Sequence, residues 1–150
     1  TKENLRIEEL VIVVDTSYST SGELVKKFLR ETFTILSETD SFFRKRKIHI
    51  IQCDELVHSD ITVTGDTDID ILINNFELAG GGNTDFRPAF EYVNNLIDTG
   101  EIKKLQGLLY FTDGKGKYPK KKMPYNTAFV FIDKLSETAV PAWAMKVSLE

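Results

Sequence analysis

The chain has 150 residues, of which 41% are hydrophobic and 28% charged, and its formal net charge is -4. This length and composition are typical of a single soluble globular domain, residues 1–150, with a substantial core. The negative charge argues against a nucleic-acid binder that relies on general attraction to phosphates. No apolar run reaches the roughly 20 residues of a membrane-spanning helix, so we expect no membrane partner.

Three features of the sequence bear on where the protein works. A single cysteine, Cys53, cannot form an internal disulfide, which fits a reducing compartment. The polar start of the chain lacks the charged, apolar and small-residue segments of a signal peptide. The first residue is Thr1 rather than Met. We therefore expect a cytoplasmic domain that has been cut from a longer protein.

The first half of the chain predicts strands and helices in alternation. Residues Glu9–Val14 end in a continuous apolar run, which is typical of a strand buried on both faces. Apolar residues at helical spacing predict a helix over Glu23–Ser37, with Ser21 as its N-cap. Further strands are predicted at Ile48–Cys53 and Leu56–Thr64, and we expect these two to pair antiparallel as an edge hairpin.

The second half continues the alternation. Helices are predicted over Ile69–Phe76 and Arg87–Ile97, the latter with a proline in its first turn. The remaining predicted strands are Gly107–Thr112, Ala128–Ile132 and Ala142–Val147. Strands that alternate with helices predict an α/β layer sandwich, with a mostly parallel central sheet, one antiparallel edge strand, and helices on both faces.

Polar side chains follow the predicted strands at points where such sheets bind ligands. Asp15, Ser17 and Ser19 leave the first strand, Asp113 leaves the strand that ends at residue 112, and Thr84 lies in a glycine-rich loop before a helix. In doubly wound sheets ligands bind beyond the carboxyl ends of the strands, near a switch in strand order. Two carboxylates and three hydroxyls form an all-oxygen ligand set, which suits a hard cation such as Mg²⁺. We predict a divalent-cation site here, with a coordination place left for a carboxylate from another molecule.

The same positions resemble von Willebrand factor A (VWA) domains. Val-Val-Asp-Thr-Ser-Tyr-Ser at residues 13–19 matches their first motif, and Gly-Gly-Asn-Thr-Asp at 81–85 is similar to their threonine loop. Phe-Thr-Asp-Gly at 111–114 is similar to their third motif. These motifs together make the metal-ion-dependent adhesion site of that family. Within it, the chain most resembles the bacterial VWA-like domains found C-terminal to predicted metallopeptidase domains.

The resemblance implies a Rossmann-like three-layer fold, a bound Mg²⁺ or Mn²⁺, and no catalytic residues in the domain itself. It implies protein binding, in which an exposed Glu or Asp of the partner completes the metal shell. It further implies that Asp15, Ser17, Ser19 and Thr84 contact the ion directly or through water, with Asp113 often acting through water. Asp85, next to Thr84, remains an alternative ligand in the middle loop. Neither the partner nor the oligomeric state follows from these motifs.

Other interpretations of the same residues stay open. The segment Asp15–Ser19 alone could be a turn that caps a helix, but this does not explain its occurrence together with Thr84 and Asp113. A phosphoryl-transfer enzyme like the haloacid dehalogenases also uses Mg²⁺ and an Asp after its first strand. Ser17, however, stands where those enzymes need an acidic residue. A third possibility is a structural domain whose metal site is idle.

The remaining chemistry-bearing residues are expected to be structural or to surround the site. We interpret His49 and His58 as bonded sheet residues, and Cys53 as a small buried hydrophobe. Because no zinc-binding pattern is present, any peptidase would lie outside this chain. Tyr18 is expected at the rim of the site. Five lysines follow Asp113 and are expected on the metal face, either as a solvated loop or as charges that steer an acidic partner. They are Lys115, Lys117, Lys120, Lys121 and Lys122.

Overall fold

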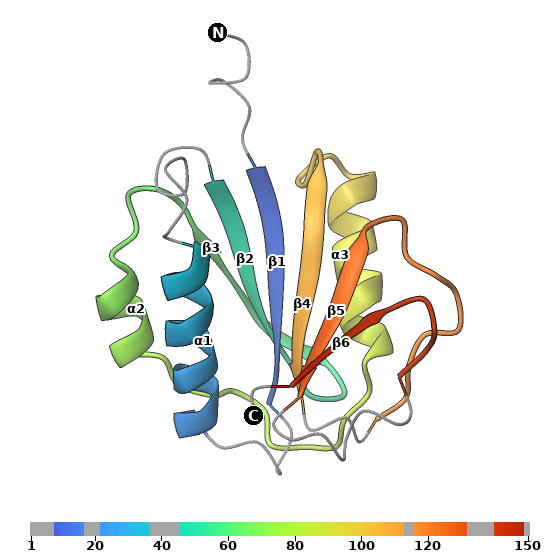
Figure 1. The fold of residues 1–150 in the computed structure, drawn as a ribbon, viewed down its shortest axis with the longest axis horizontal. Coiled ribbons are helices and arrows are strands. Elements are labelled where there is room, and N and C mark those ends of the chain that lie inside the picture. Colours follow the sequence, from blue (N-terminus) through green and yellow to red (C-terminus); the bar gives the residue numbers. More distant parts are fainter. Residues whose placement is uncertain (1–7, 17–21, 37–45, 113–115, 132–139, 149–150) are drawn as a thin grey trace, which may run out of the picture.

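The computed structural model describes residues 8–16, 22–36, 46–112, 116–131 and 140–148. These residues form one sheet with helices packed against it (Figure 1). The strands are β1 (Glu8–Asp15), β2 (Arg46–Cys53), β3 (Val57–Val63), β4 (Leu105–Thr112), β5 (Asn126–Phe131) and β6 (Met145–Ser148). The helices are α1 (Gly22–Leu36), α2 (Ile69–Asn74) and α3 (Arg87–Asp98). None of these helices is both long and apolar enough to cross a lipid bilayer.

The sheet has the strand order β3-β2-β1-β4-β5-β6. Only β3 runs antiparallel to its neighbour, so the expected edge hairpin with β2 is confirmed. From β1 the chain first builds outward through β2 and β3, and it then returns to place β4 on the other side of β1. The order of the strands therefore switches between β1 and β4, which is where doubly wound sheets bind ligands.

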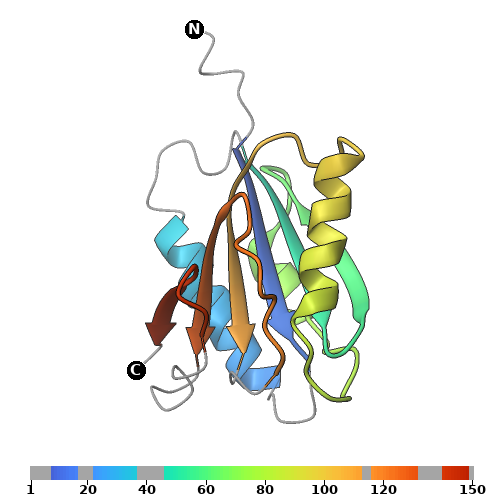
Figure 2. The same cartoon turned by 90° about the vertical axis from the view of Figure 1, so that its right-hand side faces the viewer.

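Helices cover both faces of the sheet, as predicted. Figure 2 shows the sheet lying between α1 and α3. On one face α1 buries an apolar stripe, and Phe28 of this helix stacks on Phe111 of β4 with ring centroids 4.5 Å apart. On the other face Phe86 and Phe90 pack against Tyr110 of β4 and Phe129 of β5. The two cores bury the carboxyl halves of β1 and β4, at residues 11–15 and 110–112.

The predicted elements agree with the observed ones to within a few residues, and the main difference is at the last strand. We expected it to begin at Ala142, but β6 begins at Met145. The residues before it form a turn in which the amide of Ala144 donates to the carbonyl of Pro141, 3.1 Å away. This turn takes up residues 142–144, so pairing with β5 begins only at Met145. The N-cap predicted at Ser21 lies outside the described residues.

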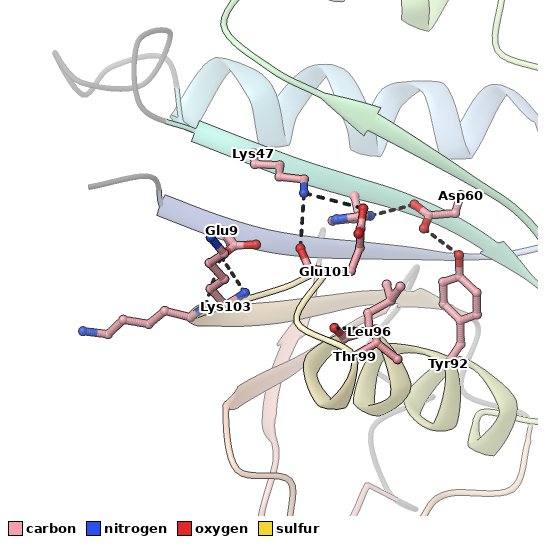
Figure 3. Close-up of polar contacts among 10 residues, drawn as sticks. Glu9, Lys47, Asp60, Tyr92, Leu96, Thr99, Glu101 and Lys103 are labelled. Atoms are coloured by element: carbon pink, nitrogen blue, oxygen red, sulfur yellow. Dashed lines mark hydrogen bonds and ion pairs between the residues drawn. The ribbon is translucent and has the colours of Figure 1, made fainter. Parts of the chain in front are cut away.

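A buried carboxylate anchors the chain at the amino ends of the strands. Glu9 of β1 is only 5% exposed, and its Oε1 accepts hydrogen bonds from the amides of Lys103 (2.9 Å) and Lys104 (3.0 Å) (Figure 3). Nearby, Lys47 Nζ donates to the carbonyl of Glu101 at 3.3 Å. These contacts fix the turn between α3 and β4. The sequence pattern did not indicate this role, because it assigned Glu9 only to the start of a strand.

Candidate metal centre

The first and third motifs meet at the switch point. Asp15 and Thr112 are the last residues of β1 and β4, and both are fully buried. Thr112 Oγ1 donates a hydrogen bond of 2.6 Å to Asp15 Oδ2. A carboxylate removed from water needs hydrogen-bond donors or a cation beside it. The contact therefore orients Asp15 at the edge of the sheet where a ligand site was predicted.

Two of the five predicted ligands, Asp15 and Thr84, lie within the described residues. The other three, Ser17, Ser19 and Asp113, lie outside them, although Asp113 directly follows Thr112 in the chain. Within the described part of the chain, no group of three or more His, Cys, Asp or Glu side chains is placed to hold a metal. Such a group was not expected, since three of the predicted ligands are hydroxyls.

The glycine-rich loop lies against the residue that follows Asp15. The amide of Gly81 donates to the carbonyl of Thr16 at 2.8 Å, and the loop passes below the carboxyl ends of the strands (Figure 1). Gly80 and Gly81 have φ angles of 128° and 102°, which side chains rarely adopt. A Cβ on Gly80 would also lie 2.7 Å from Thr16 Oγ1. Glycine is required here for both the backbone shape and the close approach.

Thr84 is held beside the segment that follows β4. Its Cγ2 lies 2.7 Å from where a Cβ on Gly116 would be, so the methyl group packs directly against that glycine. The next residue but one, Phe86, donates its amide to the carbonyl of Lys117 at 3.1 Å. Thr84 thus sits near the chain that continues from the third motif, on the carboxyl side of the sheet.

Asp85, the alternative to Thr84, is already engaged by Arg87. Its Oδ2 accepts from Arg87 Nη2 at 2.7 Å, and its Oδ1 accepts from both Nε (2.9 Å) and the backbone amide (3.0 Å) of the same residue. The hydrogen bonds from Arg87 lower the pKa of the Asp85 carboxyl. This pairing stabilises the first turn of α3, where Pro88 lies as predicted. The geometry favours Thr84 over Asp85 as the ligand from this loop.

Two residues near the site were missed by sequence reasoning. Asp54 is 4% exposed and follows β2 just as Asp15 ends β1, but in the sequence it lies only in the short connection between two predicted strands. Its position after a buried strand was the signal that could have identified it. Thr16 is 2% exposed, and its Oγ1 has no hydrogen-bond partner among the described residues. A buried hydroxyl without a partner beside Asp15 fits a site whose ligand supplies one.

The position of one lysine of the lysine-rich loop differs from the sequence prediction. We expected Lys122 on the metal face, but it lines an open pocket of about 690 Å³ with Leu105 and Gln106, at the amino end of β4. Because β5 is parallel to β4, residues 116–125 must return to the amino edge before β5 begins. Lys117 does lie at the carboxyl edge, since its carbonyl accepts from the amide of Phe86. Lys115 and Tyr18 lie outside the described residues.

Both histidines are bonded residues of the sheet, as expected, and the partner of each is a carboxylate. His49 Nδ1 lies 2.9 Å from Asp60 Oδ1, and His58 Nε2 lies 2.8 Å from Asp54 Oδ1. The prediction for Cys53 is also confirmed, because this residue is fully buried. Burial raises the pKa of its thiol to about 12, so it behaves as a neutral, small apolar group.

Comparison with known families identifies the fold that carries this site. A family model described as VWA-like domain (DUF2201) matches residues 10–150. The chain belongs to this VWA-like family. No curated protein matches it.

Solved structures agree with the VWA-like fold. The SpRpn10 VWA domain, known from a crystal structure, has 13% sequence identity to this chain and a TM-score of 0.58. The match covers 95% of this chain and 88% of that one. An aerotolerance-related membrane protein from Bacteroides fragilis NCTC 9343, solved with multiple mutations to serines, is 13% identical with a TM-score of 0.55. That match covers 83% of this chain and 67% of the other. At these identities the likeness confirms the predicted fold alone. None of these comparisons supports the haloacid-dehalogenase-like alternative.

Proposed function

We propose that this VWA-like domain is a divalent-cation-dependent protein-binding module. In this proposal Asp15, Ser17, Ser19, Thr84 and Asp113 hold Mg²⁺ or Mn²⁺, and the ion recognises an exposed Glu or Asp of a partner protein. The observation that carries it is the 2.6 Å hydrogen bond between Thr112 and Asp15, which joins the first and third motifs at the switch point. A cytoplasmic location and attachment to a metallopeptidase-like domain remain predictions from the sequence.

The described residues fit such an ion in three respects. Asp15 supplies a fully buried carboxylate, and Thr112 holds it in a fixed orientation. The glycine loop brings Thr84 to the same edge of the sheet, while Asp85 stays bonded to Arg87. A bound ion would act as a Lewis acid that accepts one carboxylate oxygen of the partner. Recognition would then depend on the metal and would require an acidic side chain.

Calorimetric titration with Mg²⁺ and Mn²⁺ tests the metal half of the proposal. We expect one ion per wild-type chain and no measurable binding by Asp15→Ala. Asp98→Ala, which removes an exposed carboxylate at the end of α3, is the matched control and should bind as wild type does. Because an ion that binds only the native state raises its stability, EDTA should also lower the melting temperature of wild type but not of Asp15→Ala. Wild-type protein that binds neither ion contradicts the proposal.

Affinity capture tests the recognition half. Proteins retained by immobilised wild-type domain in Mg²⁺ are compared with those retained in EDTA and by Ser17→Ala. A partner should be lost in both comparisons, and replacing one exposed Glu or Asp on it with Gln or Asn should abolish capture. If the partner is retained equally in EDTA, or needs none of its acidic residues, recognition through the ion is wrong.

A further inference from the structure

A single buried carboxylate joins the hairpin of β2 and β3 to the glycine loop. Asp54 Oδ1 accepts from the amide of Leu56 at 2.9 Å and lies 2.8 Å from His58 Nε2, within the hairpin. Its Oδ2 accepts from the amide of Gly82 at 3.0 Å, 28 residues further along the chain. One side chain therefore satisfies donors from two separate segments.

The backbone of the same residue makes a second connection to the loop. The carbonyl of Asp54 accepts from the amide of Asp85 at 3.1 Å. Asp54 is thus hydrogen-bonded to Gly82, two residues before Thr84, and to Asp85, one residue after it. The loop is held from the hairpin on either side of the residue proposed as a ligand.

The two outer glycines of the loop make room for this carboxylate. A Cβ on Gly82 would lie 2.9 Å from Asp54 Oδ2, and one on Gly80 would lie 3.0 Å from the same atom. The approach at Gly82 is closer than Cβ atoms make in proteins and the one at Gly80 is closer than nearly all of them, so side chains at these positions would displace either the loop or the carboxylate. The glycines and Asp54 together form one close-packed contact.

We infer that Asp54 is a positioning residue for the metal site, which holds Gly82–Asp85, and with it Thr84, at the carboxyl edge of the sheet. The inference rests on the proposed role of Thr84 as a ligand. A carboxylate that only capped the hairpin would need the bonds to Leu56 and His58 alone. The bonds to Gly82 and Asp85 instead tie the hairpin to the ligand loop.

Asp54→Asn tests this role with little change in shape. The amide oxygen can still accept from Leu56 and His58, but the amide nitrogen cannot accept from Gly82. Asp60→Asn is the matched control, because Asp60 is also a carboxylate of this hairpin bonded to a histidine, but its second oxygen accepts from Tyr92 on α3. Each 150-residue variant is compared with wild type by amide hydrogen exchange without metal, and then by calorimetric titration with Mn²⁺.

The two measurements separate this inference from the proposed function. We expect Asp54→Asn to speed exchange at Gly82 and Asp85 and to weaken Mn²⁺ binding, each by about tenfold or more, as loss of a hydrogen bond to a charged group implies. Asp60→Asn should leave the exchange rates at Gly82 and Asp85 and the Mn²⁺ affinity within about twofold of wild type. Unchanged exchange, or faster exchange with unchanged Mn²⁺ affinity, would overturn the inference. Wild-type protein that binds no Mn²⁺ would contradict the proposed function, and the exchange result would still decide whether Asp54 orders the loop.

Gly82→Ala gives an independent test if Asp54→Asn does not fold. It removes no hydrogen-bonding group of Asp54, and the added Cβ would lie 2.9 Å from Asp54 Oδ2 and 3.1 Å from Glu55 Oε1, so the strain falls between the loop and the hairpin turn. We expect faster exchange at Asp85 and weaker Mn²⁺ binding, with the amide of Leu56 still protected. Binding and exchange equal to those of wild type would show that this contact does not position the loop.

Discussion

Thr112 Oγ1 and Asp15 Oδ2 are joined by a hydrogen bond of 2.6 Å, although 97 residues separate them in the chain. The bond crosses from β4 to β1, the one pair of neighbouring strands at which the order of the sheet switches. It holds a fully buried carboxylate at the place where this fold can present a ligand. The proposed metal site is built around this contact.

Replacing Thr112 with Val should destabilise the metal-free protein. The change keeps the shape but removes a donor to a buried charge, so we expect the free energy of unfolding to fall by about 2 kcal/mol. Urea denaturation in EDTA measures this. Thr127→Val is a suitable control, because Thr127 is also buried, in β5, and among the described residues its hydroxyl makes a single long bond of 3.4 Å, to the carbonyl of Tyr125. Equal losses in the two variants would contradict a special role for the bond to Asp15.

Substitutions in the middle loop should distinguish Thr84 from Asp85. Thr84→Val keeps the methyl group against Gly116 but removes the hydroxyl, and we expect Mn²⁺ affinity to fall about tenfold or more. Asp85→Asn should change that affinity by no more than about twofold, because Arg87 already occupies both carboxylate oxygens. Calorimetric titration measures both. The opposite ranking would assign the ligand to Asp85.

Alanine substitutions at Gly80 and Gly81, the two glycines of this loop with positive φ, should destabilise the protein to different extents. Alanine at Gly81 meets no atom within 4 Å, so Gly81→Ala should cost only the backbone strain, about 1 kcal/mol. Alanine at Gly80 would in addition approach Thr16 Oγ1, Asp54 and His58, and we expect a loss larger by about 1–3 kcal/mol. Thermal and urea unfolding provide the comparison. Similar losses would mean that the loop can move away from Thr16 at no cost.

Acid should weaken the contact between β3 and α3. Asp60 lies between His49 and Tyr92, whose hydroxyl donates to Asp60 Oδ2 at 2.7 Å (Figure 3). Burial alone would raise the pKa of Asp60, but the hydrogen bonds from His49 and Tyr92 outweigh it and hold this pKa below its ordinary value of 3.8. A carboxyl with a lower pKa in the folded state stabilises the fold above its unfolded pKa, and that contribution is lost as the pH falls through the folded pKa.

Tyr92→Phe tests this pH dependence. We expect wild type to be more stable than the variant by about 1–2 kcal/mol near neutral pH, with the difference shrinking below about pH 4 as Asp60 takes up a proton. Unfolding free energies measured from neutral to acidic pH give the comparison. A difference that stays constant over the whole range would show that the charge of Asp60 is not involved.

Local patterns were enough to predict most of the fold. The apolar run that ends at Val14 predicts a buried strand, and the polar residues after it mark the carboxyl end where Asp15 is found. The same reasoning at residues 107–112 placed the third motif at the end of another strand. Because parallel strands present their carboxyl ends on one edge, these two patterns together indicated that the first and third motifs lie close together, but not the bond from Thr112 to Asp15.

Contacts between distant segments were not predictable in this way. The hydrogen bond from Gly82 to Asp54 depends on how the glycine loop crosses the hairpin. The residues next to Gly82 and next to Asp54 in the sequence do not predict this crossing. Lys122 was expected near Asp113 because the two are close in sequence. The return of the chain to the start of β5 instead carries it to the opposite edge. The Gly82–Asp54 bond and the position of Lys122 both depend on the path of a loop between two elements, and the packing of the whole chain determines that path.

Anomalous diffraction from crystals of the domain grown with Mn²⁺ tests the central claim most directly. We expect one anomalous peak at the carboxyl edge of the sheet, coordinated by oxygens of Asp15 and of the Ser17, Ser19, Thr84 and Asp113 side chains, directly or through water. No such peak should appear in crystals of Asp15→Ala. A peak located elsewhere, or none in wild-type crystals at saturating Mn²⁺, would contradict the account.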